Sequence, residues 1–233
     1  MTRIRIGVIG CGAIAQIQHL PFLTELAEEF EVGIVCDTSP SAAKYVAELF
    51  HVPRHTTDYR EVLESDVDAV LLCQTDPKTA VAVASFEAGK HVFIEKPMCA
   101  SLQEADAIIT AAEASGKVGQ VGYVKLYEPA FETARREVAT IDDVRFVQVN
   151  HLHPDNALHV QQFRTRRFDD LPDGAIEETA AARRLAMDDA IGEASAEAER
   201  AFGMLSGSLI HDLYGLRTLF GMPSRIASTE VWS

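Results

Sequence analysis

The sequence predicts an α/β fold in which a doubly wound parallel sheet is followed by a smaller α+β domain with an incomplete, mostly antiparallel sheet. Short apolar runs alternate with helical patterns through the first half of the 233 residues, as in strands joined by crossover helices. The first apolar run enters a glycine-rich turn, and the alternation changes after Tyr123. We therefore predict two domains, residues 1–123 and residues 124–233.

The first strand leads into a turn with the pattern Gly-x-Gly-x-x-Ala. In such a turn the first glycine permits a sharp bend, the second lets the backbone approach a pyrophosphate, and the small third residue lets the helix pack on the strand. The helix directs the positive end of its dipole at the anion. The residues expected to hold the pyrophosphate are Gly10, Cys11, Gly12, Ala13 and Ile14.

A second apolar strand ends at Asp37, about 20 residues after the turn, where an acidic side chain binds the ribose hydroxyls of a dinucleotide. A carboxylate at this position repels the 2′-phosphate of NADP, and the neighbouring Thr38 and Ser39 are neutral. The first domain is therefore predicted to be a Rossmann-type domain that binds NAD, with NADP the less favoured cofactor.

The other elements of the first domain follow in order along the chain. Apolar runs bounded by turn residues predict six strands, at residues 3–9, 31–36, 54–56, 69–73, 91–94 and 118–122. Apolar residues at helical spacing predict the helices between them, at residues 13–29, 40–50, 59–64, 78–88 and 102–115.

The second domain has a different pattern. Residues 144–153 alternate apolar and polar side chains and predict a long strand, and a second strand is expected from residue 225 to residue 232. Two strands with exposed edges make an incomplete sheet. Helices are predicted at residues 129–138, 175–202 and 205–220.

Two features of the second domain have more than one interpretation. The Ala-, Glu- and Arg-rich helix at 175–202 is either scaffold or a lid over the cleft. An arginine cluster at 164–167 is expected to pair with Asp169 and Asp170 rather than with nucleic acid. The helix at 205–220 carries an apolar stripe that is expected to face the core, made of Leu209, Leu213, Leu216 and Phe220.

Composition excludes several function classes. The net charge of −14 argues against nucleic-acid binding, because nucleic-acid phosphates are bound by Lys and Arg clusters. Apolar runs are too short for a membrane span, and the N-terminus has the pattern of a buried strand rather than a secretory signal. The four cysteines have no metal-ligand spacing. We expect a reduced cytoplasmic protein with no metal and no membrane or nucleic-acid partner.

Several motifs, in order, resemble the Gfo/Idh/MocA family of NAD(P)-dependent oxidoreductases. They are the glycine turn, Asp37 and residues 88–97, which read Ala-Gly-Lys-His-Val-Phe-Ile-Glu-Lys-Pro. Residues 208–213, Ser-Leu-Ile-His-Asp-Leu, with Arg217 and the Gly-Met-Pro at 221–223 are similar to the family's second-domain helix. The resemblance implies a dehydrogenase of sugars, polyols or related hydroxyl compounds, and a homo-oligomer formed through the second-domain sheet.

The resemblance also implies roles for individual residues. Lys96 is expected beside the nicotinamide and the substrate hydroxyl, after the carboxyl end of a strand, where open parallel sheets bind ligands. His211 is expected to share the hydroxyl proton, since imidazole titrates near neutral pH. Further cofactor contacts are expected at Thr75 and Glu95. The alternative for Lys96 is a surface lysine at the end of a strand, and the alternative for His211 is a histidine packed within a helix.

Four residues are candidates for substrate binding. Tyr123 and Lys125 follow the sixth strand. Tyr123 either contacts the nicotinamide or packs between domains. Lys125 either binds an anionic group of the substrate or is solvated. His151 and His153 project from one face of the predicted strand. They are expected either to line the pocket or to lie at a solvated sheet end, and their spacing also suits a metal.

The chain departs from the family pattern at three positions, one of which is Lys125, a lysine in place of the arginine of the family's Gly-aromatic-x-Arg segment. Many members carry an aspartate four residues before the active-site histidine, where this chain has Gly207, and the adjacent Asp212 points about 100° around the helix. Lys78 stands where many members have histidine. These departures keep two alternatives open: a non-catalytic dinucleotide sensor or regulatory protein, and a truncated member without full activity.

Overall fold

The computed structural model of this chain describes residues 2–75, 77–152 and 157–230. Packing divides the chain into two compact units. The first comprises Met1–Val121 with Asn156–Gly192, and the second comprises Gly122–Asp155 with Glu193–Ser233. Residues 156–192 therefore belong with the predicted dinucleotide-binding domain. The assignment of residues 1–123 to cofactor binding and 124–233 to substrate binding stays a prediction, because compactness carries no information about ligands.

A six-stranded sheet in the order β3-β2-β1-β4-β5-β6 forms the centre of the first unit. Every neighbouring pair of strands is parallel. The chain reverses its direction of winding between β1 and β4, which creates the crevice where such sheets bind ligands. The prediction of a doubly wound parallel sheet is confirmed. The strands are β1 Ile4–Ile9, β2 Phe30–Cys36, β3 His55–Thr56, β4 Ala69–Leu72, β5 His91–Ile94 and β6 Gly119–Val121.

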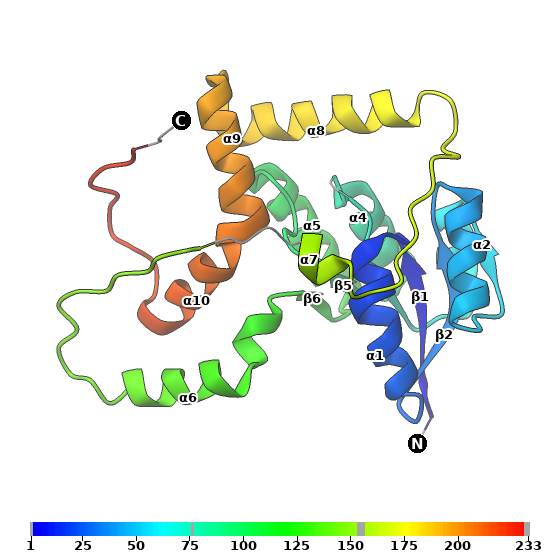
Figure 1. Ribbon diagram of the computed structural model, residues 1–233, viewed down its shortest axis with the longest axis horizontal. Helices are drawn as coiled ribbons and strands as arrows, with labels where there is room; N and C mark the ends of the chain where they lie inside the picture. Colours follow the sequence, from blue (N-terminus) through cyan, green and yellow to red (C-terminus); the bar gives the residue numbers. More distant parts are fainter. Residues whose placement is uncertain (1, 76, 153–156, 231–233) are drawn as a thin grey trace. The chain divides into compact units, whose positions relative to one another are not determined.

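Helices cover both faces of this sheet (Figure 1). Alternate strand residues point to opposite faces, so Val8 and Val35 pack with the η1–α1 and α2 side, whereas Ile9 and Ile34 pack with the α3, α4 and α5 side. The helices of the first unit are η1 Ala15–His19, α1 Leu20–Glu25, α2 Pro40–Leu49, α3 Tyr59–Glu64, α4 Thr79–Glu87, α5 Leu102–Ser115, α7 Ala157–Val160 and α8 Ala175–Ile191.

Local signals in the sequence account for the helix ends. Ser101 and Glu104 form a capping box that starts α5, and Gly116 ends it in the left-handed conformation with φ 64°. The helix after the glycine turn contains Pro21, which has no N–H for a helical hydrogen bond. Its backbone widens to π-helical geometry over η1, just before the proline, and so accommodates the missing bond.

In its described residues, 122–152 and 193–230, the second unit consists of helices joined by segments without regular structure. Its elements are η2 Val124–Tyr127, α6 Pro129–Val138, α9 Ala196–Met204, η3 Leu205–Leu209 and α10 Ile210–Phe220. The predicted helix at 175–202 is two helices, because Gly192 adopts φ 69° and Ser195 caps a new helix by accepting a hydrogen bond from Ala198 N.

The predicted second sheet is not met in the described residues. Residues 144–152 and 225–230 have no strand conformation, since a strand needs a partner for its backbone hydrogen bonds and neither segment pairs with another. The apolar stripe on α10 also differs from its prediction. Leu213 and Phe220 are 47% and 41% exposed, and they line an apolar groove with Leu216 instead of facing a core.

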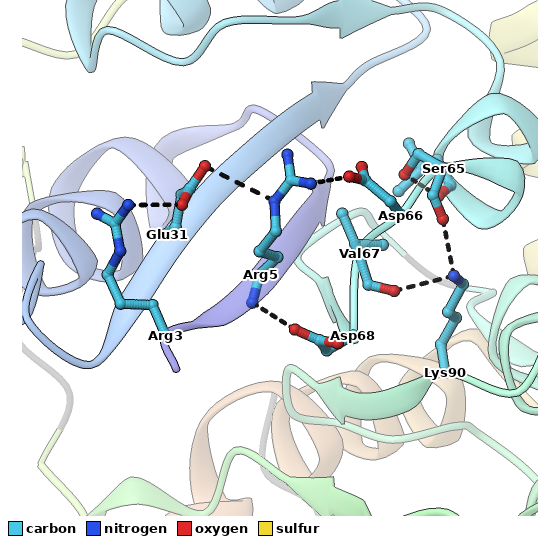
Figure 2. A network of polar contacts seen from close by, with 9 residues as sticks. Arg3, Arg5, Glu31, Ser65, Asp66, Val67, Asp68 and Lys90 are labelled. Atoms are coloured by element: carbon cyan, nitrogen blue, oxygen red, sulfur yellow. Dashed lines mark hydrogen bonds and ion pairs between the residues drawn. The ribbon is translucent and has the colours of Figure 1, made fainter. Parts of the chain in front are cut away.

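A polar network joins the amino ends of the strands (Figure 2). Glu31 pairs with Arg3 at 2.8 Å and with Arg5 at 3.6 Å, and Arg5 also pairs with Asp66. Lys90 begins the turn into β5, and its Nζ donates hydrogen bonds to the carbonyl oxygens of Ser65 and Val67, at 2.8 and 2.9 Å. The lysine of the Ala-Gly-Lys-His-Val motif therefore fixes the loop before β4.

Replacing Lys90 with alanine should lower the free energy of unfolding by about 2 kcal/mol, because two carbonyls lose a charged donor. Urea denaturation followed by circular dichroism measures this change. Lys44→Ala is the matched control, since Lys44 is exposed and its pair with Glu48 spans 3.9 Å, which is worth less than about 0.5 kcal/mol. Equal midpoints for both variants would contradict this role.

Candidate functional site

The glycine turn is built around a close backbone approach. Gly10 has φ 98°, and a Cβ at this position would lie 2.3 Å from the backbone nitrogen of Gln74. Its own N–H donates to the Cys36 carbonyl at 2.8 Å. The turn is therefore held between the carboxyl ends of β2 and β4, and only glycine fits there.

Open space surrounds the second glycine. A Cβ built on Gly12 would meet no atom within 4 Å. Helical backbone starts at Ala13, and Gln16 N donates to the Gly12 carbonyl. The first N–H groups of a helix have no partner within it and bind anions readily. The turn thus combines free space with the positive end of a helix.

Asp37 follows β2 and is tied to this turn. Its Oδ2 accepts a hydrogen bond from Cys11 N at 2.8 Å, and its Oδ1 accepts one from Ser39 N at 2.9 Å. These bonds fix the plane of the carboxylate, and each oxygen keeps a lone pair for another donor. Asp37 can therefore accept from ribose hydroxyls without rearranging.

These groups meet in one cleft of about 510 Å³ at the carboxyl edge of the sheet. Within the described residues, Nε2 and Oε1 of Gln74 are buried there without a hydrogen-bond partner. This orphaned amide, the space at Gly12 and the carboxylate of Asp37 fit a dinucleotide. The lining also includes Thr38, Thr57, Tyr59, Thr75, Leu171, Ala175, Ile176, Thr179 and Arg183.

The structure thus brings Gly10, Gly12, Asp37 and Thr75 to a common cleft. Cys11 is buried beside it and contributes its N–H to Asp37, while Ala13 and Ile14 form the first turn of the helix. Residues of helix α8 also line this cleft, and the choice between the scaffold and lid interpretations of this helix stays a prediction.

Three free thiols lie under the cleft, at Cys11, Cys36 and Cys73. Burial raises the pKa of all three, that of Cys36 from 9.0 to about 12. A thiol that stays protonated is a poor nucleophile and a poor metal ligand. They act as small apolar side chains in the core.

Lys96 follows β5, the strand next to β4, at the same edge of the sheet. The preceding Glu95 is buried, and its Oε1 lies 2.7 Å from Nε2 of His19. Glu95 Oε2 also accepts a hydrogen bond from Lys96 N at 3.1 Å. The pair fixes the backbone that carries Lys96. Sequence reasoning missed His19, although a histidine one turn after Ala15, on the packed face of the helix, was a signal for a buried partner.

Lys78, where many family members have histidine, is buried with 2% of its surface exposed. Its Nζ donates to the Pro97 carbonyl at 2.9 Å. Lys78, which immediately precedes α4, therefore holds the loop that contains Lys96 and Pro97.

In the second unit, Tyr214 of α10 contacts three of the predicted site residues. The ring of Tyr123 lies 4.5 Å from the ring of Tyr214, and His211 Nδ1 lies 2.7 Å from its hydroxyl. Lys125 N donates to the same hydroxyl at 3.3 Å, and burial raises the pKa of Tyr214. Lys125 itself is exposed.

His151 lies between two side chains of the helix that follows it. Its Nδ1 is 2.5 Å from Asp212 Oδ2, and its Nε2 is 2.8 Å from Ser208 Oγ. Asp212 is therefore turned toward His151 rather than His211, as expected from its direction on the helix. His153 lies outside the described residues.

The described part of the chain contains neither a candidate metal site nor a candidate membrane span. No group of three or more His, Cys, Asp or Glu side chains is arranged to hold a metal ion. No helix has both the length and the apolar character needed to cross a membrane.

Comparison with known proteins agrees with the cleft geometry. The model of the Gfo/Idh/MocA oxidoreductases, described as an NAD-binding Rossmann fold, matches residues 4–123, more than half of the chain. The chain belongs to the Gfo/Idh/MocA oxidoreductase family. Among its relatives is the inositol 2-dehydrogenase of Acidothermus cellulolyticus, 33% identical over 138 residues, which are 58% of this chain and 40% of that protein.

Two further proteins that this chain is similar to have different names. The 4-carboxy-2-hydroxymuconate-6-semialdehyde dehydrogenase of Sphingobium is 32% identical over 58% of this chain and 42% of its own length. The structure of GenD2 from gentamicin A biosynthesis, in complex with NAD, matches with a TM-score of 0.57 and 27% identity over 60% of this chain and 40% of that one. The chain spans about 40% of the length of these relatives.

The buried thiols predict a loss of stability in alkali. The unfolded chain ionises them near pH 9, whereas folding holds the pKa of Cys36 at about 12. The unfolding free energy is thus intact below pH 9 and falls above it, by about 1 kcal/mol per pH unit for each buried thiol. Urea titrations from pH 7 to pH 10.5 measure this slope. Cys36→Ala should reduce it and Cys99→Ser should not; equal slopes for wild type and Cys36→Ala would contradict the assignment.

Proposed function

We propose that this chain is the cofactor-binding part, with part of the substrate domain, of an NAD-dependent dehydrogenase. The reaction transfers a hydride between a nicotinamide cofactor and a CH–OH group of a sugar, polyol or related compound. The observation that carries the proposal is the cleft in which free space at Gly12, the carboxylate of Asp37 and the orphaned amide of Gln74 meet. The family and its inositol 2-dehydrogenase members support the reaction class.

Each part of the cleft has a role toward the cofactor in this proposal. The helix start at Gly12–Ile14 binds the pyrophosphate through backbone N–H groups. Asp37 accepts from the ribose hydroxyls and disfavours a 2′-phosphate, so NAD is preferred over NADP. Thr75 contacts the cofactor beyond β4, and Glu95 acts through the backbone of Lys96. The bound nicotinamide supplies the hydride acceptor or donor.

Lys96 is the proposed proton-handling residue of the first unit. In the oxidation direction its neutral amine accepts the hydroxyl proton as the carbonyl forms, and in the reduction direction its ammonium form returns that proton to the oxygen. Glu95 and His19 keep its backbone fixed, and Lys78 supports the next residue. This arrangement favours the catalytic role over that of a solvated surface lysine.

The second unit supplies the proposed substrate contacts. His211 is the second proton-handling residue, held by the hydroxyl of Tyr214. His151, oriented by Asp212 and Ser208, replaces the carboxylate missing at Gly207 as a neighbouring polar group. Tyr123 and Lys125 bind the ring and an anionic group of the substrate, and His153 stays a predicted contact.

The remaining proposals concern the whole protein. Four free cysteines, three of them buried, fit a reducing compartment, and we propose a cytoplasmic location without metal, membrane or nucleic-acid partners. A homo-oligomer formed through the second-domain sheet stays a proposal carried by the family resemblance.

Gly12→Ala should fold normally and weaken NAD binding at least tenfold, because a methyl group would take space that no protein atom uses but that the pyrophosphate needs. Isothermal titration with NAD, beside a thermal melt, measures both effects. The matched variant Gly10→Ala should instead lose thermal stability, since its methyl meets the Gln74 backbone. NAD binding unchanged by Gly12→Ala would contradict the pyrophosphate assignment.

Lys96→Ala should lower turnover by at least a hundredfold, with little effect on NAD affinity, because the substrate proton loses its acceptor. The assay follows NADH absorbance with inositols, sugars and sugar acids. Lys90→Ala, a change in the same motif at the opposite end of β5, should keep the wild-type kcat. Tight NAD binding without turnover of any compound in this panel would instead favour the dinucleotide sensor.

A further inference from the structure

The amino end of helix α2 holds a carboxylate from a distant segment of the first unit. Ser39 Oγ donates a hydrogen bond to Oδ1 of Asp170, and Ser41 N donates to Oδ2 at 2.9 Å. Ser39 is buried with 2% of its surface exposed. The sequence pattern had suggested that Asp170 pairs with neighbouring arginines; it binds a helix end instead, where the dipole favours an anion.

The donors at this end of the cleft are already divided between two carboxylates. Ser39 N donates to Asp37 at 2.9 Å, whereas Ser39 Oγ and Ser41 N donate to Asp170. Pro40, between them, has no N–H to offer. These N–H and hydroxyl donors are therefore already bonded, and a further anion beside Ser39 would be repelled by the carboxylates of Asp37 and Asp170.

Contacts of the preceding residues hold Asp170 in position. Gln16 bonds the backbone of Arg166 twice, through its Nε2 to the Arg166 carbonyl and through its Oε1 from Arg166 N, each at 3.0 Å. The Arg166 guanidinium lies 5.1 Å from the ring of Tyr45 and 5.8 Å from that of Phe168. The segment is thus fixed to the η1 helix and to α2 before it reaches the cleft lining at Leu171.

We propose that Asp170 is a second specificity-determining residue, whose negative charge beside Ser39 and Ser41 disfavours the 2′-phosphate of NADP. This inference rests on the proposed function, because it assumes that the adenosine ribose lies beside Asp37. A ribose phosphate adds about 1.5 to 2 negative charges and binds where helix N–H groups and hydroxyls are free. At this end of the cleft they are bonded to Asp170.

Asp37 and Asp170 should act differently on the two cofactors. Asp37 accepts from the ribose hydroxyls, so its loss weakens NAD itself. Asp170 is bonded to Ser39 and Ser41 and does not need to touch a 2′-hydroxyl, so its loss should affect NADP alone. The hydrogen bond from Ser39 lowers the pKa of Asp170, which keeps it negatively charged at neutral pH.

The test compares NAD and NADP affinities of the full chain by isothermal titration calorimetry. Asp170→Asn should strengthen NADP binding about tenfold, because one close negative charge is removed, and leave NAD within about twofold. Asp170→Glu keeps the charge and should keep the exclusion. Asp169→Asn, an equal charge change at the exposed neighbouring residue, should alter neither affinity. Thermal melts verify that each variant is folded.

Two outcomes separate this inference from the proposed function. If wild type binds NAD and Asp37→Ala weakens it, but Asp170→Asn leaves the NAD-to-NADP ratio unchanged, the role of Asp170 is overturned and the dinucleotide site stands. If Asp169→Asn raises NADP affinity as much as Asp170→Asn, the effect is general charge and the inference also fails. If wild type binds neither cofactor, both proposals fail together.

Discussion

The close approach of Gly10 to the backbone of Gln74 is the constraint on which the site depends. With 2.3 Å between a Gly10 Cβ and the Gln74 nitrogen, no side chain fits, and the turn can lie directly against the end of β4. The next N–H, of Cys11, then reaches Asp37 across the end of β2. One glycine thus sets the spacing between the turn and helix start that follow β1 and the Asp37 carboxylate that follows β2.

The motif at residues 88–97 places one lysine at each edge of the sheet. Residues 88–97 enter β5 at the amino edge, where Lys90 bonds two carbonyls of the loop before β4, and leave it at the carboxyl edge, where Lys96 follows the buried Glu95. The first lysine satisfies backbone groups, and the second is the residue proposed to handle the substrate proton. The four-residue strand β5 thus separates Lys90, which stabilises the fold, from Lys96, for which a catalytic role is proposed.

Local signals predicted the strands and helices of residues 3–122 closely, because each of these elements carries its own boundary signals. They did not predict α7, and they merged α8 with α9. Helices α3 and α5 begin at Asp58 and Ser101 caps, and the strands lie within apolar runs. The prediction of a second sheet was not met in the described residues. Alternation of apolar and polar residues indicates which face a strand would bury, but a segment becomes a strand only when it pairs with another. The break at Gly192 and Ser195 was readable as a stop and a cap, but strong helix propensity on both sides hid it.

The site was predictable where its chemistry is linear in sequence and not where it joins distant segments. The expectations for the turn and Asp37 follow from spacing, and that for Lys96 follows from the family motif. The pairs His19–Glu95, His151–Asp212 and Ser39–Asp170 instead each join segments that only folding brings together. These pairs hold or surround the predicted residues. A chain of net charge −14 can still attract an anionic cofactor, because oriented backbone N–H groups at a helix start favour an anion. In the proposed function, nearby carboxylates then select between the two cofactors.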